Sequence, residues 1–388
     1  MKRAVIVSAV RSGVGNYAGQ WASLEPYYFA AQVIKEAVSR TGISPDEIED
    51  VIMGNIYGLH GNIARVAALE AGIPESVGAV TIDRQCGSSI HAIFEAAMGI
   101  MAGNGDVYVA CGLEHMTREP WQMAKTTTPY ERVGPGCTPT QLSTLVTGED
   151  RVGITAEKVA GIYGLSRRDL DEYALESHNK AESAIGRGSF SEQIVPIAVK
   201  GRKGDVTLVD KDESVRFGLT MEQLSKLRPA FKEDGVVTAG NACPWSDGAS
   251  ALVIMSEERA IAMGLEILGV IYAYAVAGLD PTVMGLGPIF AAPKALKRAG
   301  ITVEDLDVIE LNEAFAAQVI PCIRELEFPP EKVNPNGGAI ALGHPLGATG
   351  GLLTTKLVYE MREKNYQYGL VTMCIGGGQG GALVIKRD

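Results

Sequence analysis

The chain carries one short pattern twice, as Gly42-Ile43 followed by Asp50-Val51-Ile52-x-x-Asn55 and as Gly300-Ile301 followed by Asp307-Val308-Ile309-x-x-Asn312. A helix-like segment precedes each copy, at residues 30–40 and 292–299, and leads through glycine to the short β-branched run. Each copy predicts a helix, a turn and a buried strand. The repeat therefore predicts two related units in one chain.

A second unit also occurs in each half, and it consists of a helix-like segment followed by a strand that ends in cysteine. Residues 90–102 precede Asp106-Val-Tyr-Val-Ala-Cys111, and residues 352–364 precede Tyr368-Gly-Leu-Val-Thr-Met-Cys374. The sequence therefore predicts an α/β fold of two similar halves, each with a mixed sheet covered by helices.

A segment of different character separates the two halves. It is rich in Pro, Thr and Gly near its start, it contains the basic stretch Lys200-Gly-Arg-Lys203, and strand-like sequence resumes at residues 249–255. We interpret the segment as an insertion in the first half, a common place for substrate binding. The predicted domains are residues 1–116 plus 246–268, the inserted loop domain 117–245, and residues 269–388.

The composition excludes several classes of protein. An apolar fraction of 46% and a charged fraction of 21% are typical of globular rather than disordered chains. The net charge of −11 argues against a nucleic-acid binder, although a few arginines on an acidic protein can still hold a phosphate. Six cysteines in 388 residues are too few for a disulfide scaffold, and no metal-binding spacing is found.

The sequence predicts no membrane span. The apolar stretch that starts at Ala4 is interrupted by Ser8 and Arg11, which favours a first β-strand over a signal peptide. The longest apolar stretch, residues 267–279, is shorter than the roughly 20 residues that cross a bilayer. We therefore expect a cytoplasmic protein.

Cys86 is the first candidate for chemistry. It follows the strand-like residues 78–82 and directly precedes a helix-like segment. The positive end of a helix dipole lowers the pKa of a thiol and favours the nucleophilic thiolate, so we expect a lowered pKa for Cys86. The alternative of a buried structural cysteine stays equally open on this pattern alone.

His344 stands in a glycine-rich segment, Asn334-Pro-Asn-Gly-Gly-Ala-Ile-Ala-Leu-Gly-His-Pro-Leu-Gly-Ala-Thr-Gly350. The glycines let the backbone pack closely around the imidazole ring, which favours a general base or an oxyanion donor over a structural histidine.

Two further candidates stand at the ends of predicted strands. Cys374 precedes a glycine-rich turn whose backbone amides can bind an oxyanion, and its thiol can act as an acid or a base. A phosphate-binding loop is the alternative for this turn, but the GxGxxG spacing and the P-loop lysine are missing. Asn312 can hold a water or a carbonyl oxygen, or can cap a helix.

Together these segments resemble the thiolase family, over nearly the full length of the chain. Further agreement lies in Gly153-Ile-Thr-Ala-Glu157, Tyr173-Ala-Leu-Glu-Ser-His178, Lys226-Leu-Arg-Pro-Ala-Phe231, Thr238-Ala-Gly-Asn-Ala242 and Met284-Gly-x-Gly-Pro288. The resemblance implies a five-layered αβαβα fold of two similar halves, with a loop domain for coenzyme A binding inserted in the first. It implies coenzyme A and acyl-CoA as substrates, no permanently bound cofactor, and a homodimer or homotetramer.

The resemblance also implies roles for single residues. Cys86 is expected to accept the acyl group, His344 to activate Cys86 as a base, and Cys374 to remove or return the α-proton of acetyl-CoA. One oxyanion site is expected from His344 with a water held by Asn312, and the other from the backbone amides of Cys86 and Gly376. An acyl-enzyme divides one hard carbon–carbon step into two easier ones, and the enolate needs donors where its charge develops.

For coenzyme A, the resemblance places Arg216 at the nucleotide end and Phe231, Ala239 and Ala242 along the pantetheine tunnel. Cys243 stands where the family usually has a serine that touches the pantetheine.

The chain also departs from the family pattern near the acyl path. Trp245 adds a large ring, and Arg151-Val152 replaces a His-Met pair that is common in acetoacetyl-CoA thiolases. These departures concern the choice of acyl chain and leave the expected chemistry unchanged.

The leading hypothesis is a thiolase that cleaves a 3-ketoacyl-CoA with free coenzyme A to acetyl-CoA and a shortened acyl-CoA, or runs the reverse Claisen condensation, by a ping-pong acyl-enzyme mechanism. A biosynthetic acetoacetyl-CoA thiolase is the close alternative. A related decarboxylating condensing enzyme is expected to lack Cys374, and a non-catalytic relative that binds coenzyme A or lipid is expected to lack one of Cys86, His344 and Cys374. The other histidines and cysteines singled out are expected to be packing or surface residues: His60, His91, His115, Cys111, Cys137 and Cys322.

Overall fold

The structure is a computed structural model, which describes residues 2–58, 60–123, 125, 129, 136–137, 152–201 and 203–388. Arg151, singled out above, lies outside the described residues. The first half and the segment inserted in it contain β1 (Ala4–Arg11), β2 (Gly15–Asn16), α1 (Pro26–Ser39), β3 (Asp50–Gly54), α2 (Ile63–Glu70), β4 (Gly78–Ile82), α3 (Ser88–Ala102), β5 (Val107–His115), α4 (Val152–Ile162), α5 (Arg167–Gly186), β6 (Ile197–Lys200), β7 (Val206–Val209), α6 (Met221–Ser225), β8 (Ser246–Ser256) and α7 (Glu257–Ala262).

The second half repeats much of this order. It contains β9 (Gly269–Gly278), α8 (Gly287–Ala299), β10 (Val308–Leu311), α9 (Ala316–Glu325), α10 (Ala339–Leu342), α11 (Thr349–Lys364), β11 (Tyr368–Ile375) and β12 (Gln379–Lys386). Both copies of the repeated pattern end in the predicted short strand, β3 in the first half and β10 in the second.

The strands lie in the order β10-β11-β12-β9-β1-β8-β5-β3-β4, with β2 beside β8. β3 is parallel to β4 and β5, and β10 is parallel to β11, while the other neighbours are antiparallel. Read outward from the β1–β9 junction, β1-β8-β5-β3 in the first half corresponds to β9-β12-β11-β10 in the second. The predicted similarity of the two halves is confirmed by this pairing.

The two half-sheets are joined, and the sequence did not predict this junction. β1 pairs with β9 only through Val5 with Val270 and Ile6 with Gly269. The pairing covers two strand edges that would otherwise expose backbone donors and acceptors. The two half-sheets therefore form one continuous hydrogen-bonded sheet, joined at its centre by the β1–β9 pairing.

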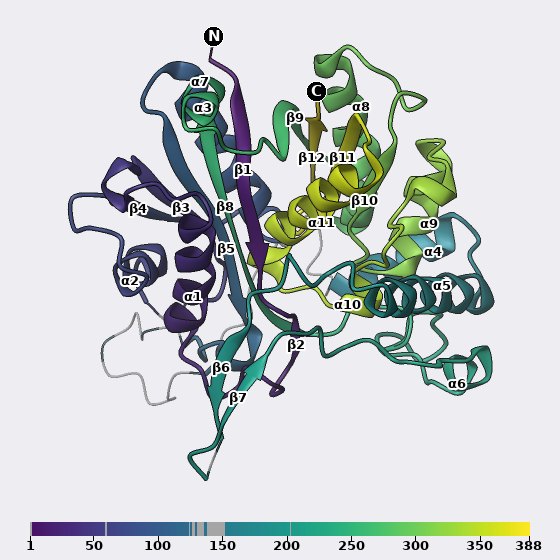
Figure 1. Ribbon diagram of the computed structural model, residues 1–388. Coiled ribbons are helices and arrows are strands. Elements are labelled where there is room, and N and C mark those ends of the chain that lie inside the picture. The colour runs from purple at the N-terminus through teal and green to yellow at the C-terminus, as the bar shows by residue number, and fades with distance from the viewer. Residues whose placement is uncertain are drawn as a thin grey trace.

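Helices cover the half-sheets in three layers (Figure 1). Side chains of α1 and α2 form one apolar cluster with the first half-sheet, including Phe29, Ile34 and Ile63. Side chains of α3 and α11 form a second cluster with strands of both half-sheets, including Phe94 and Leu357. Helices α8 and α9 pack on the outer face of the second half-sheet. In the described residues the order is thus helix, sheet, helix, sheet, helix, as the sequence resemblance implies.

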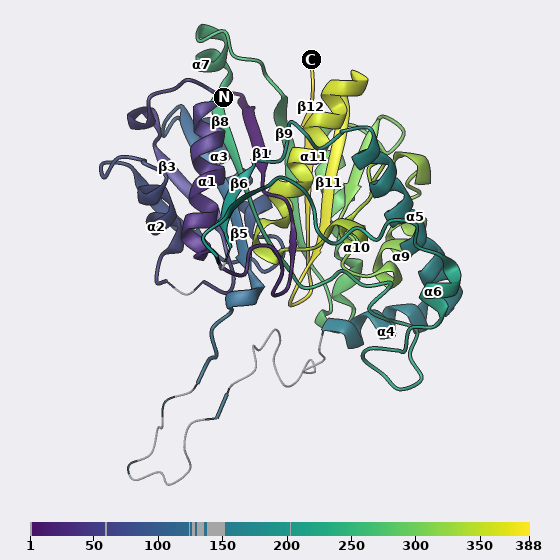
Figure 2. The same cartoon turned by 60° about the horizontal axis from the view of Figure 1, so that its bottom comes forward.

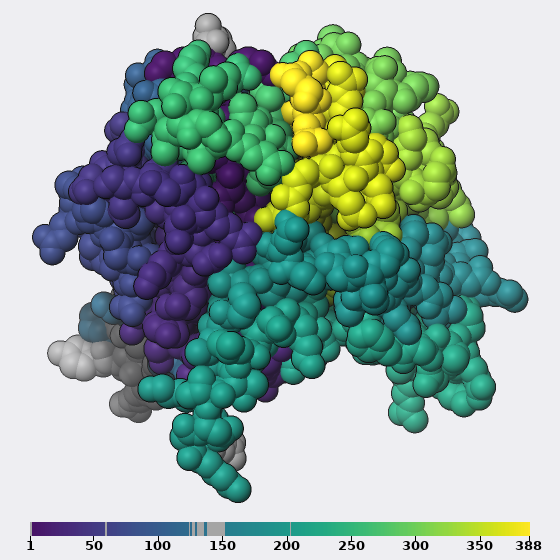
Figure 3. Space-filling model, viewed as in Figure 1, coloured from purple at the N-terminus to yellow at the C-terminus, as the bar shows by residue number. Residues whose placement is uncertain are grey.

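The inserted segment lies along one end of both halves. The chain leaves the sheet when β5 ends at His115 and returns when β8 starts at Ser246. The teal atoms of this segment cover the lower side of the molecule in Figure 3, and Figure 2 shows α4, α5 and α6 beside α9 and α10. The exact domain limits proposed above stay predictions. Among the described residues, no helix is long and apolar enough to cross a bilayer.

The two middle helices touch backbone to backbone at their first turns. A Cβ atom on Gly350, near the start of α11, would lie 2.4 Å from the backbone nitrogen of Ile90 in α3. Only glycine permits this approach. The segments that immediately precede α3 and α11 are thereby brought to the same end of the middle layer.

We predict that the middle layer dominates stability. Ile93 of α3 is fully buried, so Ile93→Ala should lower the free energy of unfolding by about 2–5 kcal/mol, because a cavity is left between the two half-sheets. The same change at Ile261 of α7, which is 66% exposed, should cost no more than about 0.5 kcal/mol. Chemical denaturation of both variants at one protein concentration checks this. Equal losses would contradict the assigned layer.

Candidate active site

Cys86 lies in a tight turn between β4 and α3. Gln85 directly before it adopts a left-handed backbone conformation with φ 48°, and Gly87 directly after it is the N-cap of α3. A Cβ on Gly87 would lie 2.3 Å from the Cδ1 atom of Ile375, the last residue of β11. Glycine at position 87 therefore allows the turn that carries Cys86, in the first half, to pack against the end of β11 in the second half.

The protonation state of Cys86 differs from the sequence-based expectation. Burial raises the pKa of the Cys86 thiol to about 11, while hydrogen bonds from the backbone amides of Gly376 and Cys86 itself lower it by less. The buried Glu114 and the nearby Asp83 raise it further. The expectation of a lowered pKa is wrong for this structure, because the desolvation of the thiol outweighs the partial charge at the helix terminus. Cys86 is a neutral thiol at pH 7 and needs a base.

His344 is fixed from several directions and is 2% exposed. Its backbone N–H donates to Ser246 Oγ at 3.1 Å, and its ring Nδ1 lies 2.7 Å from Thr349 Oγ1. Its Nε2 lies 3.4 Å from Asn312 Nδ2, so the histidine and the strand-end asparagine that the sequence singled out are in contact. Burial lowers the pKa of His344 to about 4, so the ring is neutral at pH 7 and can accept a proton.

The position of the segment around His344 also depends on Gly343 and on the buried carboxyl group of Glu114. Gly343 has φ 105°, and a Cβ there would lie 2.5 Å from Val14 Cγ1 and 2.8 Å from Ser246 Oγ. Glu114, at the end of β5, accepts a hydrogen bond from the backbone N–H of Gly347 at 3.0 Å. The His344 segment of the second half is thus docked onto residues of the first half.

The second strand-end thiol and a third cysteine complete this cluster. Cys374 lies in β11 one residue before the strand ends, and burial together with the nearby Cys86 raises its pKa well above the usual range. Burial and Cys86 also raise the pKa of Cys243 to about 12. A negative charge on Cys86 raises the pKa of both other thiols, so the three sulfur atoms lie close enough to interact electrostatically. At neutral pH Cys374 is a proton donor.

Asn312 supplies a polar group that the protein itself leaves open. Its backbone N–H donates to Thr372 O, which continues the β10–β11 ladder. Its buried side-chain Oδ1 has no hydrogen-bond partner among the residues that the structure describes. A buried acceptor of this kind costs free energy unless a partner is supplied, for example by a water or a substrate.

A pocket of about 80 Å³ lies beside this cluster and contains several residues expected to bind coenzyme A. It is lined by Asn16, His178, Ser214, Arg216, Ala239, Ala242, Pro244 and Ile340. Ala242 and Ile340 belong to the same apolar cluster as Cys374, so the pocket and the thiol border the same part of the core. Arg216 at the outer end is exposed and carries the positive charge that suits a phosphate.

Two of the expected coenzyme A residues do not line this pocket. Phe231 is 40% exposed, its ring stacks edge to face with Phe315 at 6.1 Å, and it packs closely on Gly153. Cys243 is bonded through its backbone N–H to Ala314 O, which places it next to the Asn312 segment.

Similarity to known proteins decides the family. Residues 4–258 match the thiolase N-terminal domain, and residues 265–387 match the thiolase C-terminal domain. The chain belongs to the thiolase family. It is 44% identical to the beta-ketothiolase BktB of Cupriavidus necator, over 100% of this chain and 99% of that protein.

Solved structures of other thiolases agree with the fold of this one. The acetyl-CoA acetyltransferase of Bacillus anthracis superimposes with a TM-score of 0.95 at 42% identity, and human mitochondrial 3-ketoacyl-CoA thiolase superimposes with a TM-score of 0.95 at 36% identity. Each match covers 100% of this chain and 99% of the other. The thiolase-like fold inferred from the sequence is thereby confirmed.

Sequence reasoning missed some residues of this thiolase site. His178 lines the pocket and accepts a hydrogen bond from the backbone N–H of Arg216 at 3.2 Å, and burial and Arg216 lower its pKa to about 4. Its segment was noticed only for its family resemblance, and no local signal marks the ring as part of a site. Thr349 and Ser246, the partners of His344, were also missed, because isolated hydroxyl residues carry no pattern.

The remaining histidines and cysteines have the structural roles expected of them. His60 and Cys137 are exposed, and His115 is buried with its Nε2 3.2 Å from Trp21 O. Cys111 and Cys322 are buried in apolar clusters, and His91 packs beside Phe94. Among the described residues, no group of side chains could hold a metal ion.

The pKa values predict that Cys86 depends on His344 for its reactivity. At pH 8, His344→Asn should slow alkylation of Cys86 by iodoacetamide by about 10²-fold, because the thiol loses its base. In the variant the rate should climb with pH up to about 11, since only the thiolate reacts and the raised pKa delays its formation.

Mass spectrometry of the Cys86 peptide measures this rate. His115→Asn removes another buried imidazole, which belongs neither to the thiol cluster nor to the coenzyme A pocket, and serves as the control. An unchanged pH profile in His344→Asn would rule out proton transfer between the two residues.

Proposed function

We propose that this thiolase cleaves a 3-ketoacyl-CoA with free coenzyme A to acetyl-CoA and a shortened acyl-CoA, and catalyses the reverse Claisen condensation, through an acyl-enzyme on Cys86. The observation that carries the proposal is that the buried Glu114 touches both segments: it raises the pKa of Cys86 and accepts a hydrogen bond from Gly347 of the His344 segment. Cys374 lies close enough to Cys86 for a charge on Cys86 to raise the pKa of Cys374, and His344 is neutral. Each group has the protonation state that the first step of cleavage requires.

In the first half-reaction, His344 takes the proton of Cys86, and the thiolate attacks the 3-keto carbon. The backbone amides of Cys86 and Gly376, which hydrogen-bond the sulfur, stabilise the oxyanion that forms on this carbon. When the carbon–carbon bond breaks, the acetyl-CoA enolate is stabilised by protonated His344 and by a water molecule that Asn312 holds. Cys374 then gives its proton to the enolate carbon and becomes a thiolate.

In the second half-reaction, the thiolate of Cys374 removes the thiol proton of free coenzyme A. The coenzyme A thiolate attacks the acyl group on Cys86, and the released Cys86 thiolate regains its proton from His344. All proton positions return to their starting state, so the enzyme needs no external acid or base. The two-step course gives ping-pong kinetics.

The division of labour between the two thiols is directly testable. Cys374→Ala should still form an acyl-enzyme from acetyl-CoA, seen by mass spectrometry, while thiolysis falls by about 10³-fold or more, because the enolate lacks its proton donor. Cys86→Ala should lose both the acyl-enzyme and thiolysis. Cys322→Ala, which removes a buried thiol from another apolar cluster, is the matched control and should retain both.

Thiolysis of acetoacetyl-CoA, a medium-chain 3-ketoacyl-CoA and an aromatic 3-ketoacyl-CoA defines the acyl chain that the enzyme accepts. Trp245 is 63% exposed and directly follows Pro244 of the pocket, so it is the residue to vary if a bulky substrate is preferred. A clear preference for acetoacetyl-CoA would favour the acetoacetyl-CoA thiolase alternative. Catalysis of the cleavage by Cys86→Ala would refute the proposed function.

We also propose that coenzyme A binds with its pantetheine along the pocket and its phosphates at Arg216. Arg216→Ala should raise the KM for coenzyme A by about 10-fold, because a charge-assisted phosphate contact is lost. Thiolysis with N-acetylcysteamine, which lacks the nucleotide, should not change. Arg168→Ala removes an equally positive, exposed side chain that does not line the pocket, and is the control. Equal KM changes for coenzyme A and N-acetylcysteamine would show that Arg216 does not contact the nucleotide.

A homodimer or homotetramer stays a prediction, which light scattering can test.

A further inference from the structure

The catalytic base candidate has a second buried partner that the reaction scheme does not use. Thr349, the first residue of α11, places its hydroxyl oxygen 2.7 Å from Nδ1 of His344. Both side chains are 2% exposed. The same hydroxyl lies 2.9 Å from the backbone carbonyl oxygen of Pro345.

These two contacts determine where the imidazole proton lies. A threonine hydroxyl has one proton, and the carbonyl of Pro345 can only accept, so the hydroxyl donates to Pro345. The hydroxyl oxygen must then accept from Nδ1, which therefore carries the proton. On the other side of the ring, the amide nitrogen Nδ2 of Asn312 can only donate, and it faces Nε2 at 3.4 Å. Both partners assign the same tautomer, in which Nε2 is unprotonated and its lone pair faces the amide nitrogen of Asn312.

We propose that Thr349 is a positioning residue that holds His344 in the Nδ1–H tautomer, so that Nε2 alone exchanges protons with the substrates and Cys86. This inference deepens the proposed function and rests on it. Because Nδ1 is already committed, the proton taken from Cys86 must reside on Nε2. The same Nε2–H can then donate to the enolate oxygen, so one nitrogen serves first as base and then as oxyanion donor.

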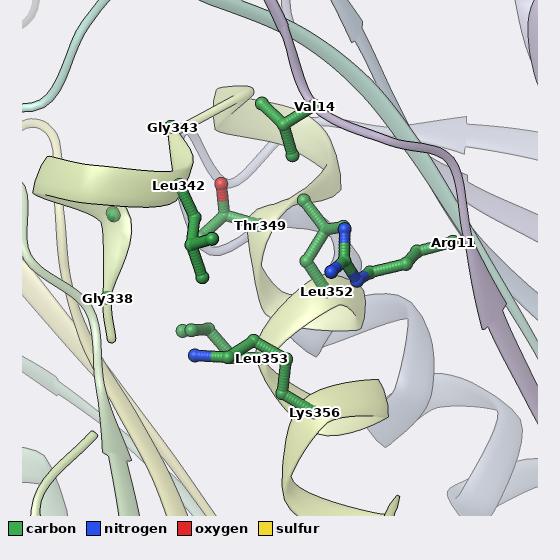
Figure 4. Close-up of a pocket in the computed structure, with 10 residues that line it drawn as sticks. Arg11, Val14, Gly338, Leu342, Gly343, Thr349, Leu352, Leu353 and Lys356 are labelled. Atoms are coloured by element: carbon green, nitrogen blue, oxygen red, sulfur yellow. The ribbon is translucent and has the colours of Figure 1, made fainter. Parts of the chain in front are cut away.

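The surroundings of Thr349 allow the effect of its hydroxyl group to be separated from the effect of its side-chain volume. A cavity of about 20 Å³ adjoins Thr349 and is also lined by Leu352, Arg11 and Lys356 (Figure 4). This volume is enough for about one water molecule. Both cations that line it are paired, Arg11 with Asp212 and Lys356 with Glu310. Thr349→Ala would enlarge the cavity toward His344, so that a water has room to replace the hydroxyl, whereas Thr349→Val would keep the space filled.

Helix α11 also contains matched controls. Thr354 and Thr355 are fully buried, and their hydroxyls donate to the carbonyls of Gly350 and Gly351, each at 2.8 Å. These are the same i to i−4 bonds that Thr349 makes with Pro345, without the contact to His344. A threonine-to-valine change at Thr355 therefore measures the cost of losing a buried hydroxyl in this helix.

The first experiment compares steady-state thiolysis by these variants. Thr349→Val should lower kcat by about 10²-fold with little change in KM, because a tautomer with Nε2–H cannot accept the proton of Cys86. Thr349→Ser should restore kcat to within about threefold of the original enzyme, and Thr349→Ala should retain more activity than Thr349→Val. Equal kcat values for Thr349→Val and Thr355→Val would overturn the proposal.

The second experiment observes the tautomer directly and needs no turnover. The ¹⁵N spectrum of histidine-labelled enzyme distinguishes a protonated from an unprotonated ring nitrogen, and His344→Asn identifies the His344 signals among those of the five histidines. We expect protonated Nδ1 and unprotonated Nε2 in the original enzyme. Protonated Nε2 at pH 7 would overturn the positioning role even if thiolysis proceeds through Cys86. Loss of thiolysis dependence on Cys86 would instead refute the proposed function and leave the tautomer result standing.

Discussion

The close approach of α3 and α11 at Gly350 is the constraint on which the site depends. Any side chain at this position would collide with the backbone of Ile90 and push the two middle helices apart. Cys86 lies two residues before the first of these helices, and Thr349 is the first residue of the second, with His344 five residues before it. The placement of the candidate nucleophile and of the candidate base is therefore set by helix packing in the core, which has the rigidity of a close-packed interior.

The enclosed cluster is electrically neutral at rest, and this follows from burial. Desolvation raises the pKa of Cys86 and Cys374 and lowers that of His344, so each group avoids charge in the resting enzyme. Charge appears only when a proton moves between them. In the proposed reaction, the backbone amides of Cys86 and Gly376 and the side chains of His344 and Asn312 would stabilise this charge. A neutral resting site also avoids the self-repulsion that two adjacent thiolates would suffer.

Much of the fold and of the thiol cluster could be predicted from the sequence, because both rest on local patterns. The sequence itself shows the repeated strands that directly precede Asn55 and Asn312, and the thiols next to helix starts and glycine-rich turns. The β1–β9 junction was not predictable, since it rests on two residue pairs that only the packing of both halves brings together. The direction of the pKa shift of Cys86 was not predictable, because Ile375 and Gly376, which surround the Cys86 turn, come from a distant part of the chain. His178 was missed for the same reason, as only the fold places α5 beside Arg216.

The two halves also show how one backbone plan can carry unequal functions. Cys111 and Cys374 occupy corresponding strands, but Cys111 is paired in the middle of β5 with Met53 and Ala251, whereas Cys374 lies two residues past the last pair between β11 and β10. Cys374 still pairs with Gly380 of β12, so the short β10 leaves only one edge of β11 open beside this thiol. In a fold built from two similar halves, the same strand can therefore serve packing in one half and carry a reactive side chain in the other. Replacement of Cys111 by a small apolar residue would change only the packing of the core, while the same replacement at Cys374 would remove the proposed proton donor.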